Sequence, residues 1–334
     1  MRIALDAMGG DYAPVETVKG ALLAAEELQV EIILVGDGPV IENELKGNSV
    51  NGLVSIEHAP EAIGMDENPA SAVRKKRNSS IVIGNGLVKK GVADAVVSAG
   101  NTGAAMASSL FGLGRVKGID RPAIATVMPS AKGPMVLVDA GANVDCKPHH
   151  LQQFAVMGSL YAERVLGIAK PRVGLINIGS EEGKGNELTQ AAYPILKETP
   201  NLNFIGNVES RELLMGNCQV MVCDGFVGNV LLKASEGVAL VLMGMVKQGL
   251  ERLASEVDPQ TLAAAMKVIK QRMDYAEYGG APLLGVNGVS IVGHGSSKAQ
   301  AIKNAIRVAK ESVEGGLVTA IGKSIGMISK GETL

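Results

Sequence analysis

Short apolar runs alternate along the chain with longer segments in which apolar residues recur at helical spacing. The apolar runs predict strands, and they are RIAL, EIILVG, LVSI, DAVVSA, AIATVM, MVLVDA, RVGLINI, NFIGNV and QVMVCD. Between most of them lie segments that predict amphipathic helices, including 15–28, 151–166 and 187–196. This alternation predicts an α/β fold built on a largely parallel, buried sheet.

The region 233–278 departs from this alternation and predicts two long helices joined by the sequence VDPQT. Asp258 is expected to be the N-cap of the second helix, with a proline as its first residue. A further strand, VNGVSIVG, and two helices at 298–312 and 317–327 complete the chain. We find no repeat, low-complexity linker or clean domain boundary in the sequence. Residues 1–334 are therefore expected to form a single α/β domain with an inserted helical hairpin.

Six of the predicted strands are followed by turns rich in glycine, asparagine and aspartate. These turns are DAMGGD (6–11), SAGNTGA (98–104), DAGANVD (139–145), NIGSEEGKG (177–185), CDGFVGN (223–229) and GHGSS (293–297). One such turn is typical of an ordinary strand-to-helix connection, since these residues tolerate left-handed backbone angles. Ligands of open α/β sheets bind beyond the carboxyl ends of the strands. We therefore expect the six turns to gather there around a ligand.

The polar groups on these turns suit an anion. Neutral donors are available from Asn101, Thr102, Asn143, Asn229 and Ser296. Lys184 lies between two glycines, which lets its ammonium approach a ligand held close to backbone. His294 also lies between glycines, before a predicted helix. A lone histidine is more often structural than catalytic, but this context shifts the balance modestly toward function. Asp6, Asp11 and Asp139 could bind a metal, but such residues more often cap loops and helix starts.

Four consecutive basic residues, Arg74 to Arg77, end a short predicted helix in the segment ENPASAVRKKRNSS. This cluster is equally consistent with a solvated helix end that complements the macrodipole and with a site for an acidic or phosphate-bearing partner. Arg74 and Arg77 lie three residues apart on one helix face, and Lys76 lies off it. The cations therefore cannot all serve one site.

Composition and the absence of certain motifs argue against nucleic-acid binding, secretion, a membrane-spanning segment and a protein nucleophile. A net charge of −2 and an aromatic content of 3% argue against a nucleic-acid partner. The N-terminus MRIALDAMGGD is unlike a signal peptide, and the uncharged stretch 238–246 is too short to span a bilayer. Three cysteines without metal spacing indicate reduced thiols in the cytoplasm. No HExxH or comparable metal-ligand spacing is present. Because the sequence has no GxSxG motif and no local Cys–His pairing, we expect a bound anion, not a protein nucleophile, to react.

Long motifs occur in a fixed order along nearly the whole chain, from about residue 1 to 328. They are DAMGGD, NPASAVRKKRNSS, ADAVVSAGNTGAAMA, RPAIATVMPS, VDAGANVDCKPHHLQQFAVMGSLYA, PRVGLINIGSEEGKGNE, FIGNVESR, VCDGFVGNVLLKASEG and GHGSSKAQA. Together they resemble the bacterial phosphate acyltransferase family of phospholipid synthesis, the PlsX type. The two helices around residue 257 and the last few residues match least distinctively.

The resemblance implies an enzyme that transfers a long-chain fatty acyl group from acyl carrier protein to inorganic phosphate. The acyl phosphate product would serve a membrane glycerol-3-phosphate acyltransferase in phosphatidic acid synthesis. The resemblance also implies a three-layer α/β/α fold like that of isocitrate and isopropylmalate dehydrogenases. It further implies a homodimer that is cytoplasmic and contacts the membrane surface peripherally. We expect no cofactor, no bound metal and no nucleic-acid partner.

For this reaction, the expected catalytic residues are Asn101, Thr102, Asn143, Lys184 and His294. The SAGNTGA turn and Lys184 would hold phosphate or the thioester oxygen, and His294 would orient phosphate or move a proton. Expected substrate-binding residues are Asp6, Gly9, Gly10, Asp11, Arg74, Lys76, Gly100, Gly103, Asp139, Gly185, Asn229 and Ser296. The basic cluster would either receive the acidic carrier protein or let Arg74 and Lys76 reach the phosphate.

Three other functions remain open from the sequence. A short-chain phosphotransacetylase would use coenzyme A, and an isocitrate-type dehydrogenase would need NAD and a metal. A non-catalytic regulator would bind phosphate or lipid without turnover. The hairpin also has two interpretations, since its apolar positions could form core or a dimer interface, or could enter a bilayer surface. The residues near the bend that would enter the bilayer are Leu253, Val257, Leu262 and Met266.

Overall fold

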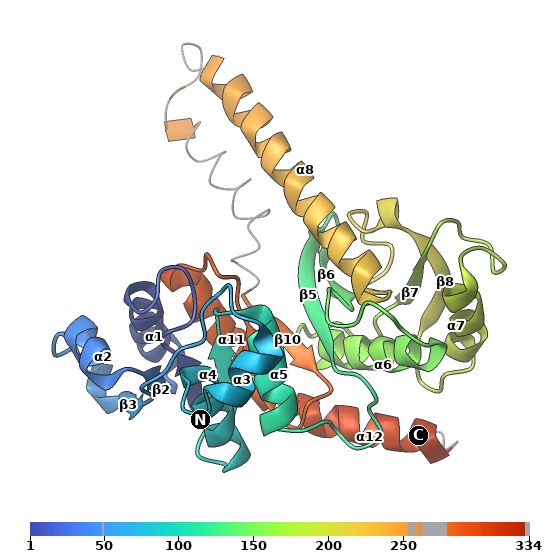
Figure 1. Cartoon of the computed structure of the whole chain (residues 1–334). Helices are drawn as coiled ribbons and strands as arrows, with labels where there is room; N and C mark the ends of the chain where they lie inside the picture. Colours follow the sequence, from blue (N-terminus) through green and yellow to red (C-terminus); the bar gives the residue numbers. More distant parts are fainter. Residues whose placement is uncertain (49, 253–257, 259, 262–278, 331–334) are drawn as a thin grey trace.

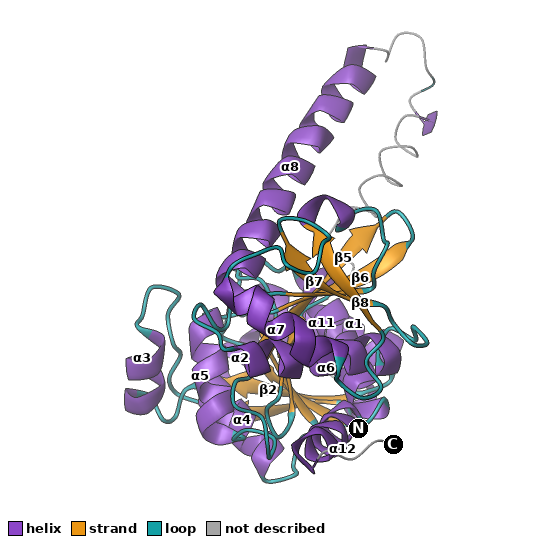
Figure 2. Ribbon diagram, turned by 90° about the vertical axis from the view of Figure 1, so that its right-hand side faces the viewer, coloured by secondary structure: helices purple, strands orange, loops and turns teal. Residues whose placement is uncertain are grey.

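The computed structural model describes residues 1–48, 50–252, 258, 260–261 and 279–330 (Figure 1). The described residues form one mixed sheet of eleven strands, with helices on both faces (Figure 1 and Figure 2). In spatial order the strands are β3 (Val54–His58), β2 (Glu31–Gly36), β1 (Arg2–Asp6), β4 (Ala95–Ser98), β11 (Val289–Val292), β10 (Ala281–Leu284), β5 (Ala123–Ser130), β6 (Gly133–Val138), β9 (Val220–Val222), β7 (Val173–Asn177) and β8 (Phe204–Glu209). The three-layer α/β/α architecture and every strand predicted from an apolar run are confirmed.

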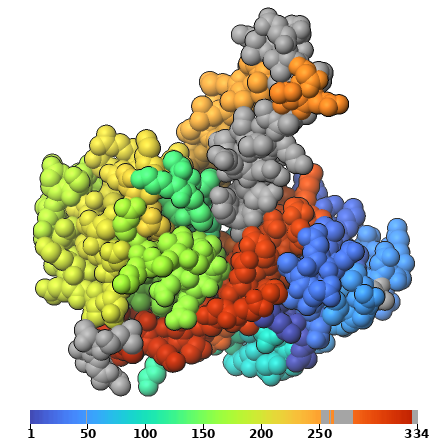
Figure 3. All heavy atoms as spheres, turned by 180° about the vertical axis from the view of Figure 1, so that it is seen from behind, coloured from blue at the N-terminus to red at the C-terminus, as the bar shows by residue number. Residues whose placement is uncertain are grey.

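The helices form the two outer layers. They are α1 (Val15–Leu28), α2 (Gly38–Leu45), α3 (Pro69–Lys75), α4 (Ser80–Lys89), α5 (Thr102–Gly112), α6 (Pro148–Arg164), α7 (Glu187–Lys197), α8 (Gly225–Arg252), α11 (Ala299–Glu314) and α12 (Leu317–Lys330). In β1, Ile3 and Leu5 pack with α1 and α11, whereas Ala4 packs with α4 and α5 on the opposite face. At the other end of the sheet, α6, α7 and α12 cover one face and α8 begins over the other. From behind, the C-terminal part of the chain, in red, runs across the surface between the blue N-terminal part and the green and yellow part (Figure 3).

The sheet consists of two parallel blocks that run in opposite directions. The first block is β3-β2-β1-β4-β11, and the second block is β6-β9-β7-β8. Three antiparallel pairings, β11 with β10, β10 with β5 and β5 with β6, join the blocks and reverse the direction. The expectation of a largely parallel sheet is confirmed. The apolar pattern does not predict β10, whose short sequence APLL contains a proline, a residue that weakens a strand signal.

α8 begins at Gly225, earlier than the predicted residue 233, and extends away from the sheet (Figure 1). Asp224 promotes this early start, because its Oδ1 accepts the N–H of Val227 at 2.9 Å. Asp258 is confirmed as an N-cap, since its Oδ2 accepts the N–H of Thr261 at 3.0 Å. The predicted bend residues Leu253, Val257, Leu262 and Met266 lie outside the described residues.

Among the described helices, α8 over Gly225–Leu250 is the one long and apolar enough, by length and composition, to cross a membrane. Its distal part carries exposed apolar side chains at positions i, i+3, i+4, i+7 and i+8, which we call the α8 stripe. The stripe consists of Val238, Val241, Leu242, Met245 and Val246. Glu236 and Lys247 lie on the opposite side of the helix, where Leu240 is also exposed.

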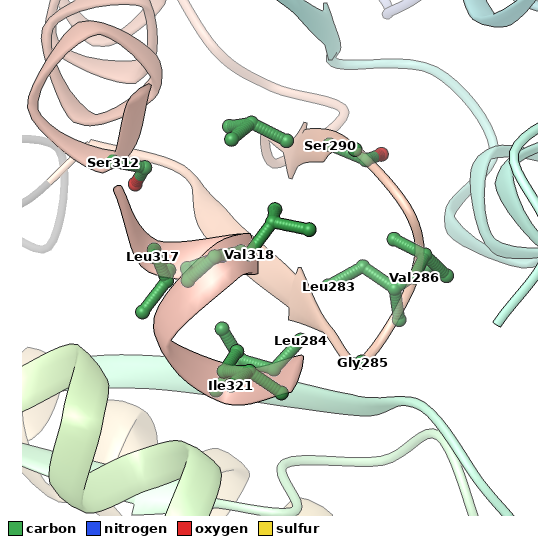
Figure 4. Close-up of a pocket in the computed structure, with 12 residues that line it drawn as sticks. Leu283, Leu284, Gly285, Val286, Ser290, Ser312, Leu317, Val318 and Ile321 are labelled. Atoms are coloured by element: carbon green, nitrogen blue, oxygen red, sulfur yellow. The ribbon is translucent and has the colours of Figure 1, made fainter. Parts of the chain in front are cut away.

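A cavity of about 10 Å³ lies where β10, β11 and the start of α12 meet (Figure 4). Leu283, Val286, Val318 and Ile321 contribute to its mostly apolar wall. A volume of this size holds at most about one water molecule. The cavity is therefore a packing gap and not a substrate site.

Gly20 provides a test of the packing between α1 and α11. A Cβ on Gly20 would lie 2.5 Å from the Cβ of Ile302 in α11. We expect Gly20→Ala to lower the free energy of unfolding by about 1–3 kcal/mol through overpacking, although alanine is the better helix former. Urea denaturation measures this change.

Gly86→Ala in α4 is the matched control for this prediction. A Cβ on Gly86 meets no atom within 4 Å. This variant should therefore keep the stability of the parent or raise it by up to about 1 kcal/mol. Equal stability of the two variants would contradict the close approach of α1 and α11.

Candidate functional site

Three glycine-rich turns meet at the carboxyl ends of β1, β4 and β11, which are neighbours in the first block. These turns are DAMGGD, SAGNTGA and GHGSS. The N–H of Asp11 donates to the carbonyl of Gly295 at 2.8 Å. Gly10 has a φ of +118°, and a Cβ there would meet the carbonyl oxygens of Gly295 and Ala99 at 3.2 and 3.3 Å. The turns therefore touch through their backbones, an approach that a glycine at position 10 permits.

Asp6 lies beneath these turns at the end of β1, with 4% of its surface exposed. Its Oδ2 accepts the hydroxyl of Ser98 at 2.7 Å, and the Ser98 oxygen accepts the N–H of Gly100 at 3.1 Å. A Cβ on Gly9 would come within 2.5 Å of the same carboxylate oxygen. Burial raises the pKa of Asp6, and its hydrogen bonds oppose that shift. Asp6 thus ties the DAMGGD turn to the SAGNTGA turn from below.

Asn101 is the N-cap of α5, and both ends of its side-chain amide are engaged. Its Oδ1 accepts the N–H of Ala104 at 3.0 Å. Its Nδ2 donates to the carbonyls of Met65 and Glu67 at 2.8 and 3.2 Å. Asn101 therefore holds the loop before α3 against the SAGNTGA turn, and it can act on a ligand through this positioning.

α5 and α11 both begin at these turns, but their N-terminal donors differ. In the part of the chain that the structure describes, the N–H groups of Thr102 and Gly103 in α5 have no hydrogen-bond partner. In α11, the N–H of Ala299 donates to Oε2 of Glu16 at 2.8 Å, and this bond lowers the pKa of Glu16. Free donors at a positive helix end suit an anion. α5 is therefore the better candidate of the two for phosphate.

His294 is exposed, and Ser296 orients its imidazole. The ring Nδ1 lies 2.8 Å from the Ser296 hydroxyl and accepts the N–H of Ser296 at 3.2 Å. Because that N–H needs a lone pair on Nδ1, the neutral ring carries its proton on Nε2. The neutral imidazole can then donate a hydrogen bond from Nε2.

Asp139 follows β6 in the second block and is completely buried. Its Oδ1 accepts the N–H groups of Ile124, Gly141 and Ala142 at 3.1, 3.2 and 2.9 Å. Its Oδ2 accepts the backbone N–H and the Nδ2 of Asn143 at 2.7 and 2.8 Å. Burial raises the pKa of Asp139, and these donors oppose the shift because they fit the ionised carboxylate. The DAGANVD turn is folded around this one side chain.

The first turn of α8 packs directly on the DAGANVD turn. The N–H of Gly225 donates to the carbonyl of Asn143 at 2.7 Å. Gly228 lies so close to the carbonyl of Asp139 that a Cβ on it would overlap the oxygen. Asn229 is exposed beside Gly141. The CDGFVGN and DAGANVD turns therefore form one unit, with Asn229 at its surface.

Lys184 lies in the exposed loop after β7, with half of its side chain accessible and its Nζ 4.0 Å from Oε1 of Glu181. The base of this loop is fixed by Asn177, which donates to the carbonyl of Lys184 at 3.0 Å, and by Asn207, which donates to the carbonyl of Glu181 at 2.8 Å. Gly185 has a φ of +104°, which favours glycine. The ammonium of Lys184 thus extends from an anchored loop, and its contact with an anion stays a prediction.

The six turns form two groups of three in the sheet, and their gathering around one ligand stays a prediction. The first group follows strands of the first block, and the second follows β6, β9 and β7 of the second block. The antiparallel steps through β10 and β5 reverse the strand direction between the groups. α5 links them, because it begins at the SAGNTGA turn and its Met106 packs in one cluster with Ala142 and Leu232.

The basic cluster divides between two environments. Lys76 donates to Oε1 of Glu67 at 2.6 Å and to the carbonyl of Ala62 at 2.8 Å, so it holds the loop that Asn101 also holds. Arg74 lies near the end of α3, with its guanidinium carbon 5.5 Å from the centroid of the Phe111 ring. Direct contact of either cation with phosphate stays a prediction.

Asp120, His149 and His150 are the described residues whose ligand atoms lie close enough together to hold a metal ion, within 4.8 Å of one another. The sequence did not single out this cluster. His149 Nε2 lies 2.7 Å from Oδ2 of Asp120, and Nδ1 of His150 accepts the N–H of Lys147 at 3.1 Å. A metal would compete with the hydrogen bonds that begin α6. The cluster is therefore better explained as a capped helix start.

The cysteines near the turns are poor nucleophiles. Burial raises the pKa of Cys146 and of Cys218 to about 12, and it raises that of Cys223 well above the usual value. Near neutral pH these groups are thiols, and the thiolate is the reactive form. The cysteines therefore do not offer the site a protein nucleophile.

A family model described as "Fatty acid synthesis protein" matches residues 1–319. The phosphate acyltransferase of Desulforamulus reducens is 64% identical over 97% of each chain. That of Pelotomaculum thermopropionicum is 60% identical over 98% of this chain and 96% of the relative. A phosphotransacetylase from Streptococcus pyogenes shares the fold, with a TM-score of 0.64 at 17% identity over 94% of each chain. So does a 4-hydroxythreonine-4-phosphate dehydrogenase from Klebsiella pneumoniae, with a TM-score of 0.52 at 12% identity over 94% of this chain and 98% of that one. The chain therefore belongs to the family of fatty acid synthesis proteins that includes these phosphate acyltransferases.

Proposed function

We propose that this enzyme moves a long-chain fatty acyl group from acyl carrier protein to inorganic phosphate and so supplies acyl phosphate for phospholipid synthesis. The observation that carries the proposal is the 64% identity, over 97% of both chains, to a relative named phosphate acyltransferase. The site is compatible with this reaction, since it offers anion donors and its cysteines are protonated.

Phosphate itself is the nucleophile in this reaction. Near neutral pH it is an oxyanion, and one of its oxygens forms a bond to the thioester carbon while the carbonyl oxygen gains negative charge. The C–S bond then breaks, and the departing thiolate takes up a proton to become a thiol. The protein has to place phosphate against the carbonyl and to stabilise the developing oxyanion.

The donors of the two turn groups supply these tasks. The free N–H groups of Thr102 and Gly103 suit phosphate or the oxyanion, because they extend from a positive helix end. Lys184 adds a point charge from the second block. The Nε2–H of His294 suits phosphate or the departing sulfur. Asn101 acts as a positioning residue, because its amide holds backbone at the same place.

The α8 stripe supports a further part of the proposal, that the enzyme is a homodimer. The stripe is exposed in the single chain, and exposed apolar surface of this kind marks an interface. Glu236 and Lys247 lie on the opposite side, so the stripe is the wider uncharged face of this part of the helix. We propose that the α8 stripe of a second copy of the chain covers this face. The alternative is that a membrane surface covers it. We further propose that the enzyme is cytoplasmic and passes its apolar product to a membrane acyltransferase.

The reaction is tested by measuring phosphate-dependent loss of acyl-ACP while hydroxylamine traps the acyl phosphate. Long-chain acyl-CoA and acetyl-CoA are assayed in parallel. Trapped product from acyl-ACP supports the proposal, whereas turnover of acetyl-CoA alone would indicate a short-chain phosphotransacetylase. Turnover with NAD would indicate a dehydrogenase. Binding of phosphate or lipid by folded protein, without any product, would leave a regulatory role.

Lys184→Ala is expected to lower kcat/KM for phosphate about a hundred-fold or more, because a charged donor to the reacting anion is lost. Lys197→Ala is the matched control, since Lys197 is also exposed and lies 3.5 Å from Glu182 of the same loop. Steady-state kinetics at varied phosphate compare the two variants. Equal values would remove Lys184 from the mechanism.

Cys146→Ser is expected to retain the turnover of the parent enzyme, because a thiol with a pKa of about 12 does not form the acyl-enzyme. Rapid-quench kinetics should show no burst of released carrier. Detection by mass spectrometry of an acyl group on Cys146 during turnover would contradict this mechanism.

Leu242→Asp is expected to convert the dimer to a monomer, because it places a charge in the α8 stripe. Leu240→Asp is the control, since Leu240 is 75% exposed but lies off the stripe. Light scattering measures the mass, and flotation with phospholipid vesicles measures membrane contact. Lost flotation at unchanged mass would assign the stripe to the membrane, and no change in either would contradict both interpretations.

A further inference from the structure

A pocket of about 290 Å³ opens between the C-terminal ends of α3 and α5. Val73, Val82 and Phe111 give it apolar walls, and Arg74 and Arg77 also line it. The ring of Phe111 is 51% exposed, which is unusual for a side chain of this size. α3 lies beside α5 at the edge of the molecule, where a partner has access (Figure 2).

Positive charge beside this pocket has no acidic partner. Arg74, Lys75 and Arg77 are exposed, and within the described ranges of the chain none of them forms an ion pair. The fourth cation of the cluster, Lys76, is already paired with Glu67. The guanidinium of Arg74 lies over the Phe111 ring, so charged and apolar surface are continuous. Such a surface complements a partner that presents acidic side chains around an apolar one.

α5 connects this pocket to the candidate site. It begins at Thr102 in the SAGNTGA turn and ends at Gly112, which lines the pocket, and its eleven residues span about 16 Å. A thioester on a long flexible arm can therefore be held at one end of α5 while it reacts at the other.

We propose that the pocket between α3 and α5 is the docking site for the acyl carrier protein. An acidic helix of the carrier lies across Lys75 and Arg77. One of its apolar side chains enters the pocket against Phe111. This is the helix-in-groove mode of recognition, in which apolar anchors supply affinity and charges at the rim speed encounter. The inference rests on the proposed function, which identifies the carrier as the acyl donor.

A membrane is the other surface that attracts exposed cations beside an aromatic ring. The pocket is concave, and a concave site fits a protruding side chain better than it fits a flat bilayer. The α8 stripe also offers a longer apolar surface for lipid. The observations therefore favour the carrier, and lipid binding is an outcome that the experiment can detect.

The test compares Arg77→Glu and Phe111→Ser with Arg211→Glu. Arg211 is the matched control, because it is a cation of the second block with 78% of its side chain exposed. Each variant is assayed with acyl-ACP and with acyl-pantetheine, a thioester without the carrier. We expect Arg77→Glu to raise KM for acyl-ACP about tenfold and to weaken its dependence on salt, with kcat unchanged. Phe111→Ser should raise the same KM without changing the salt dependence. Both variants should keep the parent's kinetics with acyl-pantetheine.

The outcomes separate this inference from the proposed function. If the parent enzyme forms no acyl phosphate from either donor, the proposed function fails and the docking site with it. If the parent turns over acyl-ACP and both variants keep its KM, the docking site alone is overturned. An equal rise of KM in Arg211→Glu would show a general charge effect and would also count against the pocket. If Arg77→Glu and Phe111→Ser no longer float with phosphatidylglycerol vesicles but keep the parent's KM for acyl-ACP, the pocket binds lipid and not the carrier.

Discussion

Two buried aspartates, one in each block of the sheet, hold the turns on which the candidate site depends. Asp139 accepts five N–H hydrogen bonds, and Asp6 accepts the hydroxyl of Ser98 and the N–H of Met8. A buried carboxyl group is costly unless its oxygens are paired, so each turn has to fold closely around its aspartate. This close folding requires glycine at two positions of the turns. A side chain on Gly9 would collide with Asp6, and one on Gly228 would collide with the backbone of Asp139.

Many polar side chains of the turns form hydrogen bonds within the protein, so fewer polar groups can bind a substrate. The amides of Asn101 and Asn143 and the ammonium of Lys76 are engaged within the protein. Among the described residues, candidates to meet an anion are the backbone N–H groups at the start of α5, the half-exposed ammonium of Lys184 and the exposed imidazole of His294. These groups can bind, orient and transfer a proton, but none is a covalent nucleophile of the usual kind. The site therefore suits a reaction in which the bound anion itself attacks.

The elements of this fold could largely be predicted from the sequence, because buried strands are short apolar runs and the turns carry glycine, asparagine and aspartate. Residues 15–28 were expected as a helix and form α1. The alternation predicted the parallel pairings but not the reversal between the two blocks, because the short β10 that begins the reversal has little pattern of its own. The engagement of Asn101 was equally hidden. Its partners, Met65 and Glu67, lie 36 and 34 residues away in the sequence.

The helix α5 fixes the distance between the pocket and the N–H donors of the candidate site. Its N-terminus offers the free donors, Met106 in its middle packs with Ala142 of the second block, and its last turn lines the pocket beside Phe111. A flexible loop between the pocket and the donors would let their separation vary, whereas a helix fixes it through its rise of about 1.5 Å per residue. With the carrier docked at that pocket, the distance to the reacting anion is set by a rigid element. Only the flexible arm of the substrate then has to adjust for the thioester to meet phosphate.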